Sequence, residues 1–425
     1  MNHGFRLLIV LLLAQTPAHS EVITWTGREG RDWYNPANWN PQIVPGPTDT
    51  VEMNISSMDI PASATFGVMN LRGALVGKMT VSNIVNWTSG ELYHLDMTIA
   101  PGGVLNVSGS SDKYITSGSI INSGTINWSG PFTILTGDGT GITNQAGGMM
   151  ELTGGSTFST RPASIVLTTF WNEGTIRKSD ESQVNFNLVN FRNWGLIDIQ
   201  GGLLGVTFQS FYQHGGETRL SGGGLLGNEF YFYAGDLTGS GSVIGNVYHY
   251  GLINVIGNPG NISISGQLTQ FGSSVLDVQT GATGGHISIG GMAKINGIAK
   301  LRRPPGEEPA QGSQFELISA SSVQGVFNNY TTSPDSTVGY KLRYSATNVI
   351  VGTLSKPVLV SKVVNPTTIN FRAYGDPNFR YVLQVSTNLA DWTDLYSTNS
   401  SSGDLDYNWL GSAAPGATFY RVNIP

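Results

Sequence analysis

A short phrase that returns about every twenty residues constrains the fold of this chain most. Between residues 170 and 255, an aromatic residue, a polar residue, a glycine and an aliphatic residue recur in that order. The polar position aligns as Asn122, Asn144, Asn172, Asn193 and Gln213, which are 22, 28, 21 and 20 residues apart. This period is too short for helical hairpin repeats, and the Leu framework of leucine-rich repeats is absent. It is typical of one coil of a parallel β-helix.

Stacked coils place equivalent side chains one strand spacing apart, so each position of the phrase predicts a ladder. The aromatic position predicts an internal apolar ladder of Phe170, Phe191, Phe211, Tyr231 and Val247. The aliphatic position predicts a second one of Ile126, Ile176, Ile197, Leu237 and Ile253. The Asn and Gln side chains are expected to hydrogen-bond along the stack, and the glycine to supply a positive φ at the corner. From Gly90 to about Gly290 the repeats predict roughly ten coils.

The composition agrees with short strands joined by many turns. Gly accounts for 56 of 425 residues and charged residues for only 12%, whereas long helices would need more Ala, Glu, Lys and Leu. The net charge of −6 argues against a nucleic-acid partner, which would need a basic surface. The chain contains no cysteine, which removes disulfides and Cys–metal sites.

The N-terminus has the three parts of a secretory signal peptide, which we assign to residues 1–20. Arg6 supplies the positive charge, residues 7–13 the apolar segment, and Ala18 and Ser20 the small residues before the cleavage site. The apolar segment is too short to be a stable anchor, and the sequence contains no second one. The mature protein is therefore expected to be secreted or at the cell surface, without a stable transmembrane anchor.

Residues 21–64 form a distinct leading segment with three tryptophans, Trp25, Trp33 and Trp39. Clustered aromatic faces suit sugar stacking, but the first coil of a repeat domain also needs an atypical cap. We favour the cap. The Trp-x-Gly, Asn-Trp and Val-Pro-Gly pieces of this segment resemble the N-terminal part of large exported bacterial β-repeat proteins.

Residues 65–354 hold the repeats and the region that closes them. From residue 286 the phrase is lost, and the pieces 312–318, 325–327 and 340–344 follow. This succession resembles the terminal part of exported bacterial parallel β-helix proteins, including autotransporter passengers. The resemblance implies that larger strands close the solenoid.

A last module is expected over residues 355–425. Residues 379–387 alternate apolar and polar side chains, as a strand with one buried face does. Together with Trp392 and residues 419–422 they resemble a small C-terminal β-sandwich module of exported bacterial proteins, with Trp392 and Phe419 in its core. The fold class predicted for the whole chain is all-β, a right-handed parallel β-helix with an N-terminal cap and a small C-terminal β-sandwich.

The sequence offers no catalytic constellation, although parallel β-helices are a frequent scaffold for polysaccharide lyases and glycosidases. Common glycosidases need two carboxylates facing one sugar bond, whereas Glu173, Asp198 and Glu217 lie at different phases of the coil. Calcium-dependent lyases need clustered Asp, which the repeat region lacks. The four histidines of the mature chain are too scattered for a metal site. We predict no catalytic residue, no metal and no cofactor.

One outward aromatic strip is the candidate contact surface. Three positions before the glycine lie Trp171, Tyr212, Phe232 and Tyr248, with Arg192 interrupting them. If the aromatic ladder points inward, strand alternation directs these side chains outward. Such a strip can stack on an extended glycan or contact a protein partner. The alternative is that a loop covers it, or that the coil is buried on both faces.

These features favour an exported, non-enzymatic structural or adhesive β-helix protein of the cell surface or the extracellular space. Its partners would be an extracellular polysaccharide or another surface protein. The alternative is a polysaccharide-binding or polysaccharide-degrading protein, a lyase or glycoside hydrolase, on the same scaffold.

Overall fold

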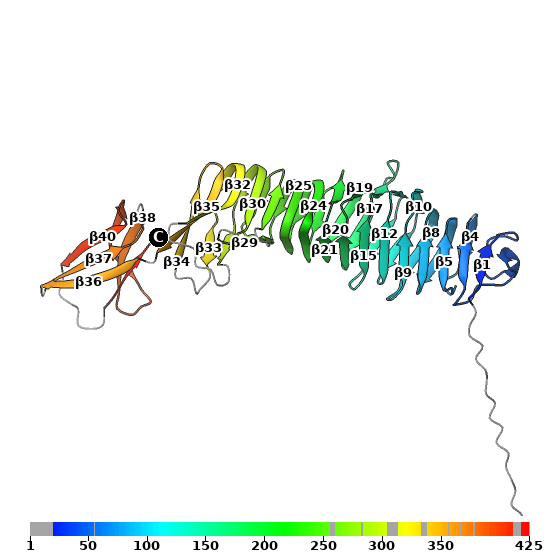
Figure 1. Ribbon diagram of the computed structural model, residues 1–425, viewed down its shortest axis with the longest axis horizontal. Helices are drawn as coiled ribbons and strands as arrows, with labels where there is room; N and C mark the ends of the chain where they lie inside the picture. Colours follow the sequence, from blue (N-terminus) through cyan, green and yellow to red (C-terminus); the bar gives the residue numbers. More distant parts are fainter. Residues whose placement is uncertain are drawn as a thin grey trace, which may run out of the picture. The chain divides into compact units, whose positions relative to one another are not determined.

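A computed structural model (Figure 1) gives the fold of residues 20–424, except for residues 55, 256–259, 282–283, 304–312, 333–337, 356, 366, 377–378 and 411–417. The signal peptide predicted for residues 1–20 lies outside the described residues, apart from Ser20. The chain is all-β, with 64% strand and 1% helix, and it winds into a β-solenoid of about 12 turns followed by small antiparallel sheets. The predicted fold class is thereby confirmed.

The chain divides into two compact units. The first ends at Leu196 and includes Leu204–Gln209, and the second comprises Ile197–Leu203 and the chain from Ser210 onward. The first unit contains one short 3-10 helix, η1 (Pro36–Asn38), and the strands β1 (Val22–Trp25), β2 (Trp39–Asn40), β3 (Thr50–Met53), β4 (Ser57–Ile60), β5 (Val68–Leu71), β6 (Ala74–Val81), β7 (Ile84–Trp87), β8 (Gly90–Ile99), β9 (Val104–Val107), β10 (Lys113–Thr116), β11 (Ser119–Asn122), β12 (Thr125–Ser129), β13 (Thr133–Thr136), β14 (Gly141–Asn144), β15 (Met149–Thr153), β16 (Thr157–Thr160), β17 (Thr168–Asn172), β18 (Thr175–Lys178), β19 (Gln183–Asn187) and β20 (Val189–Asn193).

The strands β21 (Leu196–Ile199) and β22 (Leu203–Thr207) lie where the two units divide. The solenoid part of the second unit contains β23 (Phe211–Gln213), β24 (Glu217–Phe232), β25 (Asp236–His249), β26 (Leu252–Val255), β27 (Asn261–Ile264), β28 (Leu268–Gln270), β29 (Val275–Gln279), β30 (His286–Ile295), β31 (Ile298–Arg302), β32 (Gln314–Gly325), β33 (Asn329–Thr332), β34 (Val338–Tyr344) and β35 (Asn348–Ser355). Its C-terminal strands are β36 (Val358–Asn365), β37 (Thr368–Tyr374), β38 (Phe379–Ser386), β39 (Thr393–Ser400), β40 (Asp404–Leu410) and β41 (Phe419–Asn423).

Successive coils of the first unit pair in parallel, and from β9 onward each strand pairs with the strand three positions later. β12 pairs with β9 on one side and β15 on the other, and β14 pairs with β11 and β17 in the same way. Most of these strands are only four or five residues long and alternate buried and half-exposed side chains, so each strand contributes two inward residues to the core. The parallel pairing already begins at β1 and β3, where Val22 pairs with Thr50.

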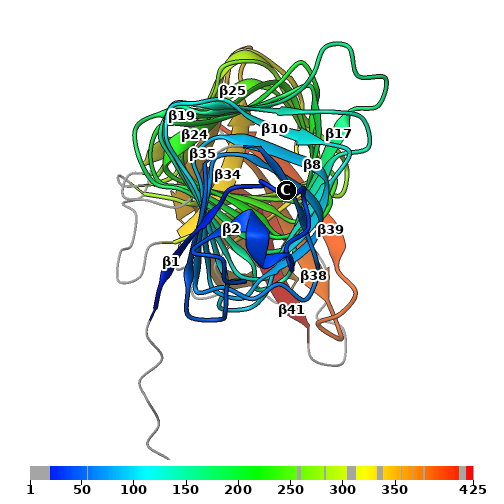
Figure 2. The same cartoon turned by 90° about the vertical axis from the view of Figure 1, so that its right-hand side faces the viewer.

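The three tryptophans of the leading segment form a packed core and not an exposed platform. Trp39 contacts Trp25 and Trp33 edge to face, with ring centroids 4.9 Å apart in both pairs. Each of the three side chains is only 1% exposed, and the indole N–H of Trp39 donates to the carbonyl of Trp33 at 2.8 Å. Trp25 and Trp39 are register partners in the antiparallel pair of β1 and β2, two strands labelled in Figure 2. Because the three rings are buried, they do not form a platform on which a sugar could stack, and the cap stays a prediction.

The predicted aliphatic ladder is buried along its whole length, with Ile126, Ile176, Ile197, Leu237 and Ile253 at most 2% exposed. In the aromatic ladder, Phe170 and Phe191 stack with ring centroids 5.0 Å apart, and Phe211, in the second unit, pairs in register with Phe230. The prediction of Tyr231 in this ladder is wrong. Three residues separate β24 from β25, while two separate β17 from β18, so Gly235 follows the inward Phe230 by five positions instead of four.

The amide position forms a hydrogen-bonded ladder inside the first unit, as predicted. Nδ2 of Asn122 donates to Asn144 at 2.7 Å, Asn144 donates to Asn172 at 2.8 Å, and Asn172 donates to Asn193 at 2.7 Å. All four side chains are fully buried. Gln213 is buried too, and its Nε2 donates to the carbonyl of Asp236 at 3.0 Å.

The reason for glycine at the repeated corner differs from the prediction. Gly174 and Gly195 do not have a positive φ. A Cβ added to Gly195 would instead lie 2.1 Å from the carbonyl oxygen of Gly174, and one added to Gly174 would lie 2.3 Å from that of Gly148. Close approach of the neighbouring coil, not backbone conformation, therefore requires glycine there. A positive φ does occur in the three-residue corners, at Gly216 and Gly235.

An antiparallel hairpin closes the solenoid part of the second unit. β34 pairs antiparallel with β35, and β35 pairs antiparallel with β32, where Gln314 is the partner of Gly352. β32 also pairs in parallel with β30, so that Ser288 is the partner of Ser319. The hairpin thus brings β35 beside β32, and Val351 of β35 lines a cavity described below.

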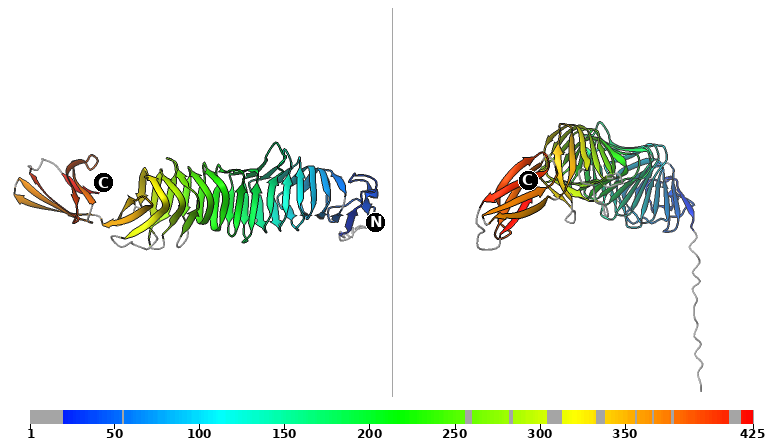
Figure 3. Two further views of the ribbon diagram at one scale, coloured as in Figure 1. Left: turned by 90° about the horizontal axis from the view of Figure 1, so that it is seen from above. Right: turned by 60° about the vertical axis from the view of Figure 1, so that its left-hand side comes forward.

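The C-terminal strands form two three-stranded antiparallel sheets, drawn in orange and red in Figure 3. One sheet has the order β36-β37-β40 and the other the order β39-β38-β41. Their shared apolar core consists of Phe371, Ala373, Phe379, Tyr381, Leu383 and Leu405. The prediction for Phe419 is wrong, because this side chain is 36% exposed. Trp392 lies outside the core and packs under the guanidinium of Arg421 at 4.1 Å.

Candidate functional site

The predicted aromatic strip is a real outward column in the second unit, with one residue changed. Tyr212 pairs in register with Tyr231, which pairs with Tyr248, and all three side chains are half-exposed. Phe232 is completely buried and pairs with Gln213 and His249 on the inner face. The prediction that Phe232 points outward is wrong. The longer corner that shifts the apolar ladder also places Tyr231, instead of Phe232, in the outward column.

The tyrosine rings of this column cover one another's faces. The centroids of Tyr231 and Tyr248 lie 4.7 Å apart with the planes 8° from parallel, and those of Tyr212 and Tyr231 lie 5.5 Å apart at 17°. Two rings that lay side by side in one plane could not bring their centroids this close. The tyrosine rings are therefore stacked face to face, with an offset, along the coil axis. The surface therefore presents ring edges and hydroxyls to solvent. A pyranose ring has no free row of aromatic faces on which to stack.

A second aromatic column lies at the adjacent corner, and its rings also stack from one coil to the next. His214, Tyr233, Tyr250 and Phe271 follow one another there, and Tyr250 and Phe271 stack with centroids 3.9 Å apart and planes 3° from parallel. The hydroxyl of Tyr231 donates to Oε2 of Glu229 at 2.8 Å, and this bond, with burial, raises the pKa of Tyr231. The array is thus fixed by ring stacking and by a hydrogen bond to a carboxylate.

Trp171 is the predicted contact residue of the first unit, and it lies on the surface as expected. Its side chain is 41% exposed and stacks on Trp194, which is 36% exposed, with centroids 5.4 Å apart and planes at 22°. The pair is formed across successive coils, because Trp171 belongs to β17 and Trp194 follows β20. Contact of Trp171, Tyr212 and Tyr248 with a glycan or a partner stays a prediction.

Two carboxylates that the sequence left apart come together in the second unit. Glu217 and Asp236 are register partners on adjacent coils, beside a cavity of about 490 Å³ lined in part by Glu217 and Arg219. Burial, together with the charge of Glu217, raises the pKa of Asp236. Both oxygens of Glu217 are already engaged, since Arg219 donates to each of them and Thr238 donates to Oε1. A base or nucleophile needs a free oxygen, and Glu217 is held as a structural acceptor.

The outer polar column of the first unit also joins coil to coil. Nδ2 of Asn86 donates to Oδ1 of Asn70, Asn106 donates to Asn86, and Asn127 donates to Asn106, each at 2.8 Å. The ladder ends at Glu52, which accepts from Asn70 at 2.5 Å. Repeated outward asparagines are thus used in the same way as the buried ones.

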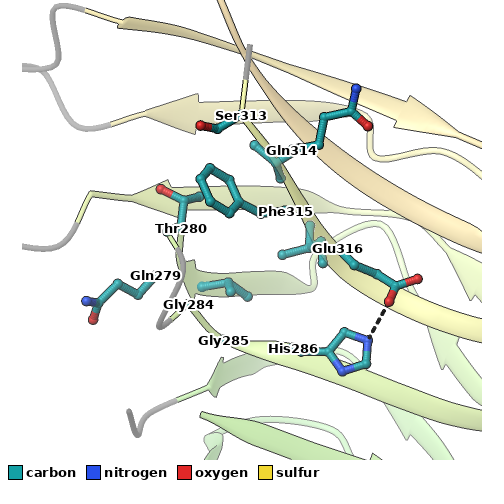
Figure 4. A pocket seen from close by; sticks show the side chains of 13 residues that line it. Gln279, Thr280, Gly284, Gly285, His286, Ser313, Gln314, Phe315 and Glu316 are labelled. Atoms are coloured by element: carbon teal, nitrogen blue, oxygen red, sulfur yellow. Dashed lines mark ion pairs between the residues drawn. The ribbon is translucent and has the colours of Figure 1, made fainter. Parts of the chain in front are cut away.

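A cavity of about 540 Å³ lies at the closed end of the solenoid part of the second unit (Figure 4) and was not predicted. Nε2 of His286 lies 3.0 Å from the hydroxyl of Ser319 and 3.8 Å from Oε2 of Glu316. Nδ2 of Asn348 donates to Oε1 of the same carboxylate. Burial lowers the pKa of His286, and the charge of Glu316 opposes this effect. Serine and carboxylate both face one ring nitrogen, so the geometry differs from that of a hydrolase triad, in which they occupy opposite nitrogens.

The described residues contain no group of three or more His, Cys, Asp or Glu side chains that could hold a metal ion. None of the helical structure in the described ranges has the length and apolar character that a bilayer crossing requires. Comparison with protein families finds no family model that matches this chain, and comparison with curated proteins finds no match either. Its class is therefore defined by its fold, a β-solenoid with small antiparallel sheets toward the C-terminus.

Proposed function

We propose that this chain is an exported, non-enzymatic structural or adhesive protein of the cell surface or extracellular matrix. The observation that carries the proposal is that outward side chains hold neighbouring coils together as the inward ones do. Tyr231 stacks on Tyr212 and Tyr248 outside the coil, and Asn106 bonds to the coils on both sides of it. Side chains engaged in this way stiffen the scaffold and are not free to act on a substrate.

The engagement of the acidic groups supports the non-enzymatic part of the proposal. Glu217 accepts from Arg219 and Thr238. Asp198, only 7% exposed, accepts from Ser221 at 2.9 Å and from Gln200 at 2.8 Å. Carboxylates held by two or more hydrogen-bond donors keep a fixed position. Such groups stabilise a surface more readily than they transfer protons to a glycosidic oxygen.

The test measures turnover and attachment separately. The mature chain, beginning at Glu21, is incubated with a panel of neutral and acidic polysaccharides, and new reducing ends and unsaturated uronate products are followed. We expect no product above the buffer control, and we expect the protein in the cell-surface or culture-medium fraction of the producing cells. Release of product from any polysaccharide would overturn the non-enzymatic assignment, and a cytoplasmic location would overturn export.

The runner-up function is polysaccharide degradation, and the pair Glu217 and Asp236 is the observation that favours it. A raised pKa at Asp236 is what a general acid needs. If turnover is found, Asp236→Asn should abolish it. The same substitution at Asp277, another outward carboxylate, is the matched control and should leave turnover unchanged. Loss in both variants, or in neither, removes the pair as the catalytic site.

A further inference from the structure

Two tyrosine rings on neighbouring coils of the second unit lie close enough to react with each other. Tyr231 and Tyr248 are register partners, and their ring centroids lie 4.7 Å apart with the planes 8° from parallel. Adjacent β-strands are themselves about 4.8 Å apart, so the spacing of the coils holds the two rings together. Both side chains are half-exposed. Reagents in solvent therefore reach the pair, and the rings have room to tilt.

The hydroxyl of Tyr231 has a proton acceptor already in place. It donates to Oε2 of Glu229 at 2.8 Å, and both residues lie on β24, two positions apart and thus on the same side of the strand. The same hydrogen bond raises the pKa of Tyr231, so the proton stays on the phenol until an electron leaves. A carboxylate within hydrogen-bond reach then takes that proton as a general base. This arrangement favours Tyr231 as the ring at which oxidation begins.

The surrounding tyrosines extend the stack. The ring centroid of Tyr231 lies 5.5 Å from that of Tyr212 and 5.9 Å from that of Tyr233. Tyr233 in turn lies 5.8 Å from Tyr250. An electron removed from one of these rings can be replaced by its neighbour over such short distances. Oxidation anywhere in the array can therefore reach Tyr231, where the proton has an acceptor.

We propose that Tyr231 and Tyr248 form a dityrosine crosslink that joins two adjacent coils covalently. The co-reactant is a one-electron oxidant, such as a haem peroxidase supplied with hydrogen peroxide. Each ring loses its hydroxyl hydrogen, the electron passing to the oxidant and the proton to Glu229 or to water. The two radicals couple through the ring carbons next to the hydroxyls, and the hydrogens on those carbons move to the oxygens and restore both phenols. Hydrogen peroxide takes up the two electrons and two protons and leaves as water.

The crosslink does for this chain what a disulfide does in other proteins. The chain contains no cysteine, so any covalent bond between its coils needs other side chains. A bond between neighbouring coils restricts the unfolded chain and thereby stabilises the folded one. The inference goes beyond the proposed structural function and does not depend on it, because it needs only the folded chain and an oxidant.

The experiment oxidises the folded chain, from Glu21 onward, with a haem peroxidase and a limiting amount of hydrogen peroxide. Proteolysis and mass spectrometry identify the linked peptides, whose mass is two hydrogen atoms below the sum of the separate peptides. Dityrosine fluorescence gives the rate. We expect the link between Tyr231 and Tyr248 in monomeric protein, together with a higher urea midpoint than before oxidation. Tyr231→Phe and Tyr248→Phe should each abolish this link.

A further variant tests the carboxylate. Glu229→Gln keeps the size of the side chain and removes its charge, and it should slow formation of the link at least about tenfold, because a positioned base contributes a factor of this order or more. The matched controls are Glu173→Gln, at an exposed glutamate, and Tyr34→Phe, at a tyrosine that is 52% exposed. Both should leave the rate and the yield unchanged. Far-UV circular dichroism before oxidation shows that each variant is folded.

Another stacked tyrosine pair in the same chain provides an internal comparison. The rings of Tyr396 and Tyr407 lie 4.6 Å apart at 10° and pack against the apolar core of the C-terminal sheets. We expect this pair to link more slowly than Tyr231 and Tyr248. Equal rates for the two pairs, or an unchanged rate in Glu229→Gln, overturn the proton transfer to Glu229. Linkage only between different molecules, or oxidation of exposed tyrosines such as Tyr34 without a link between Tyr231 and Tyr248, overturns the crosslink itself.

Discussion

Asn144 donates a hydrogen bond from Nδ2 to Oδ1 of Asn172 over 2.8 Å, and neither side chain is exposed to solvent. Nδ2 of Asn144 also lies 3.2 Å from the carbonyl oxygen of Thr175. Each rung therefore joins the amide of one coil to the backbone and the amide of the next. Amide groups that are buried without such partners would be strongly unfavourable.

Asn172→Leu should destabilise the protein by about 2–4 kcal/mol, since it removes two buried hydrogen bonds, the one from Asn144 to Asn172 and the one from Asn172 to Asn193. The same substitution in the outer ladder, Asn106→Leu, should cost less than about 1 kcal/mol, because water reaches the half-buried neighbours. Urea unfolding followed by circular dichroism gives both values. Equal losses would show that burial of the inner ladder does not matter.

The sequence was sufficient to predict this ladder because the phrase repeats where the coil repeats. Phe170, Ile176 and Asn193 were placed by counting alone, since every regular coil has two residues at the corner. The count failed at Tyr231 and Phe232, because the corner that follows Phe232 has one more residue. Because side chains alternate between the two faces of a strand, this error of one position exchanged the predicted inward and outward directions of Tyr231 and Phe232.

The cavity could not be predicted, for a different physical reason. His286 and Glu316 lie on strands of a region without the phrase, and Asn348 reaches Glu316 only through an antiparallel hairpin. Register between non-repeating strands leaves no periodic signal in a sequence. The pairing of Glu217 with Asp236 was not predicted, because the extra corner residue gives the two carboxylates different positions when they are counted from the glycine of the phrase.

Gly174→Ala should destabilise the protein by about 3 kcal/mol, as overpacking against backbone does. The added methyl group would lie 2.3 Å from the carbonyl oxygen of Gly148, and neither coil can shift without breaking its ladder. The control is Gly147→Ala, where φ is +87° but no atom lies within 4 Å. That variant should lose only about 1–2 kcal/mol from backbone strain. If Gly147→Ala proves the more harmful in urea unfolding, the close-approach explanation is wrong.

The buried Lys113 should make stability rise with pH in the alkaline range. Its ammonium group donates to the carbonyl of Ser111 at 2.9 Å and lies 3.9 Å from the ring centroid of Phe132. Burial lowers its pKa from 10.5 to about 8, and the charge of Asp112 opposes this effect. Between these two values the unfolded chain holds the proton that the native state has released, so the free energy of unfolding increases with pH.

Lys113→Met should remove this rise and leave the protein at least as stable as the wild type near neutral pH. The measurement is the urea midpoint at several pH values between about 7 and 9.5, below the titration of the tyrosines. Lys300→Met, at an exposed lysine of β31, is the control and should keep the wild-type dependence. A wild-type midpoint that does not rise relative to Lys113→Met contradicts the buried ammonium.

His249 should make the protein sensitive to acid. It occupies the amide position of its coil, in register with Gln270, and is completely buried. Burial lowers the pKa of His249 from 6.5 to about 3, while the backbone of Leu252 opposes this effect. The native state therefore keeps a neutral ring while the unfolded chain takes up a proton below about pH 6.5. Stability falls as pH decreases toward 3, by at most about 1.4 kcal/mol per pH unit.

His249→Gln isolates this effect, because glutamine already occupies the same position at Gln213 and Gln270. The variant should match the wild type near pH 7 and become the more stable of the two at about pH 4.5, with the gap widening as the pH falls. Urea midpoints measured in parallel cancel the contribution of the carboxylates, which both proteins share. His94→Asn, at an exposed histidine with a φ of 47° that asparagine tolerates, should retain the wild-type loss. Parallel curves for the wild type and His249→Gln would mean that the buried ring titrates normally and that water reaches this rung of the solenoid.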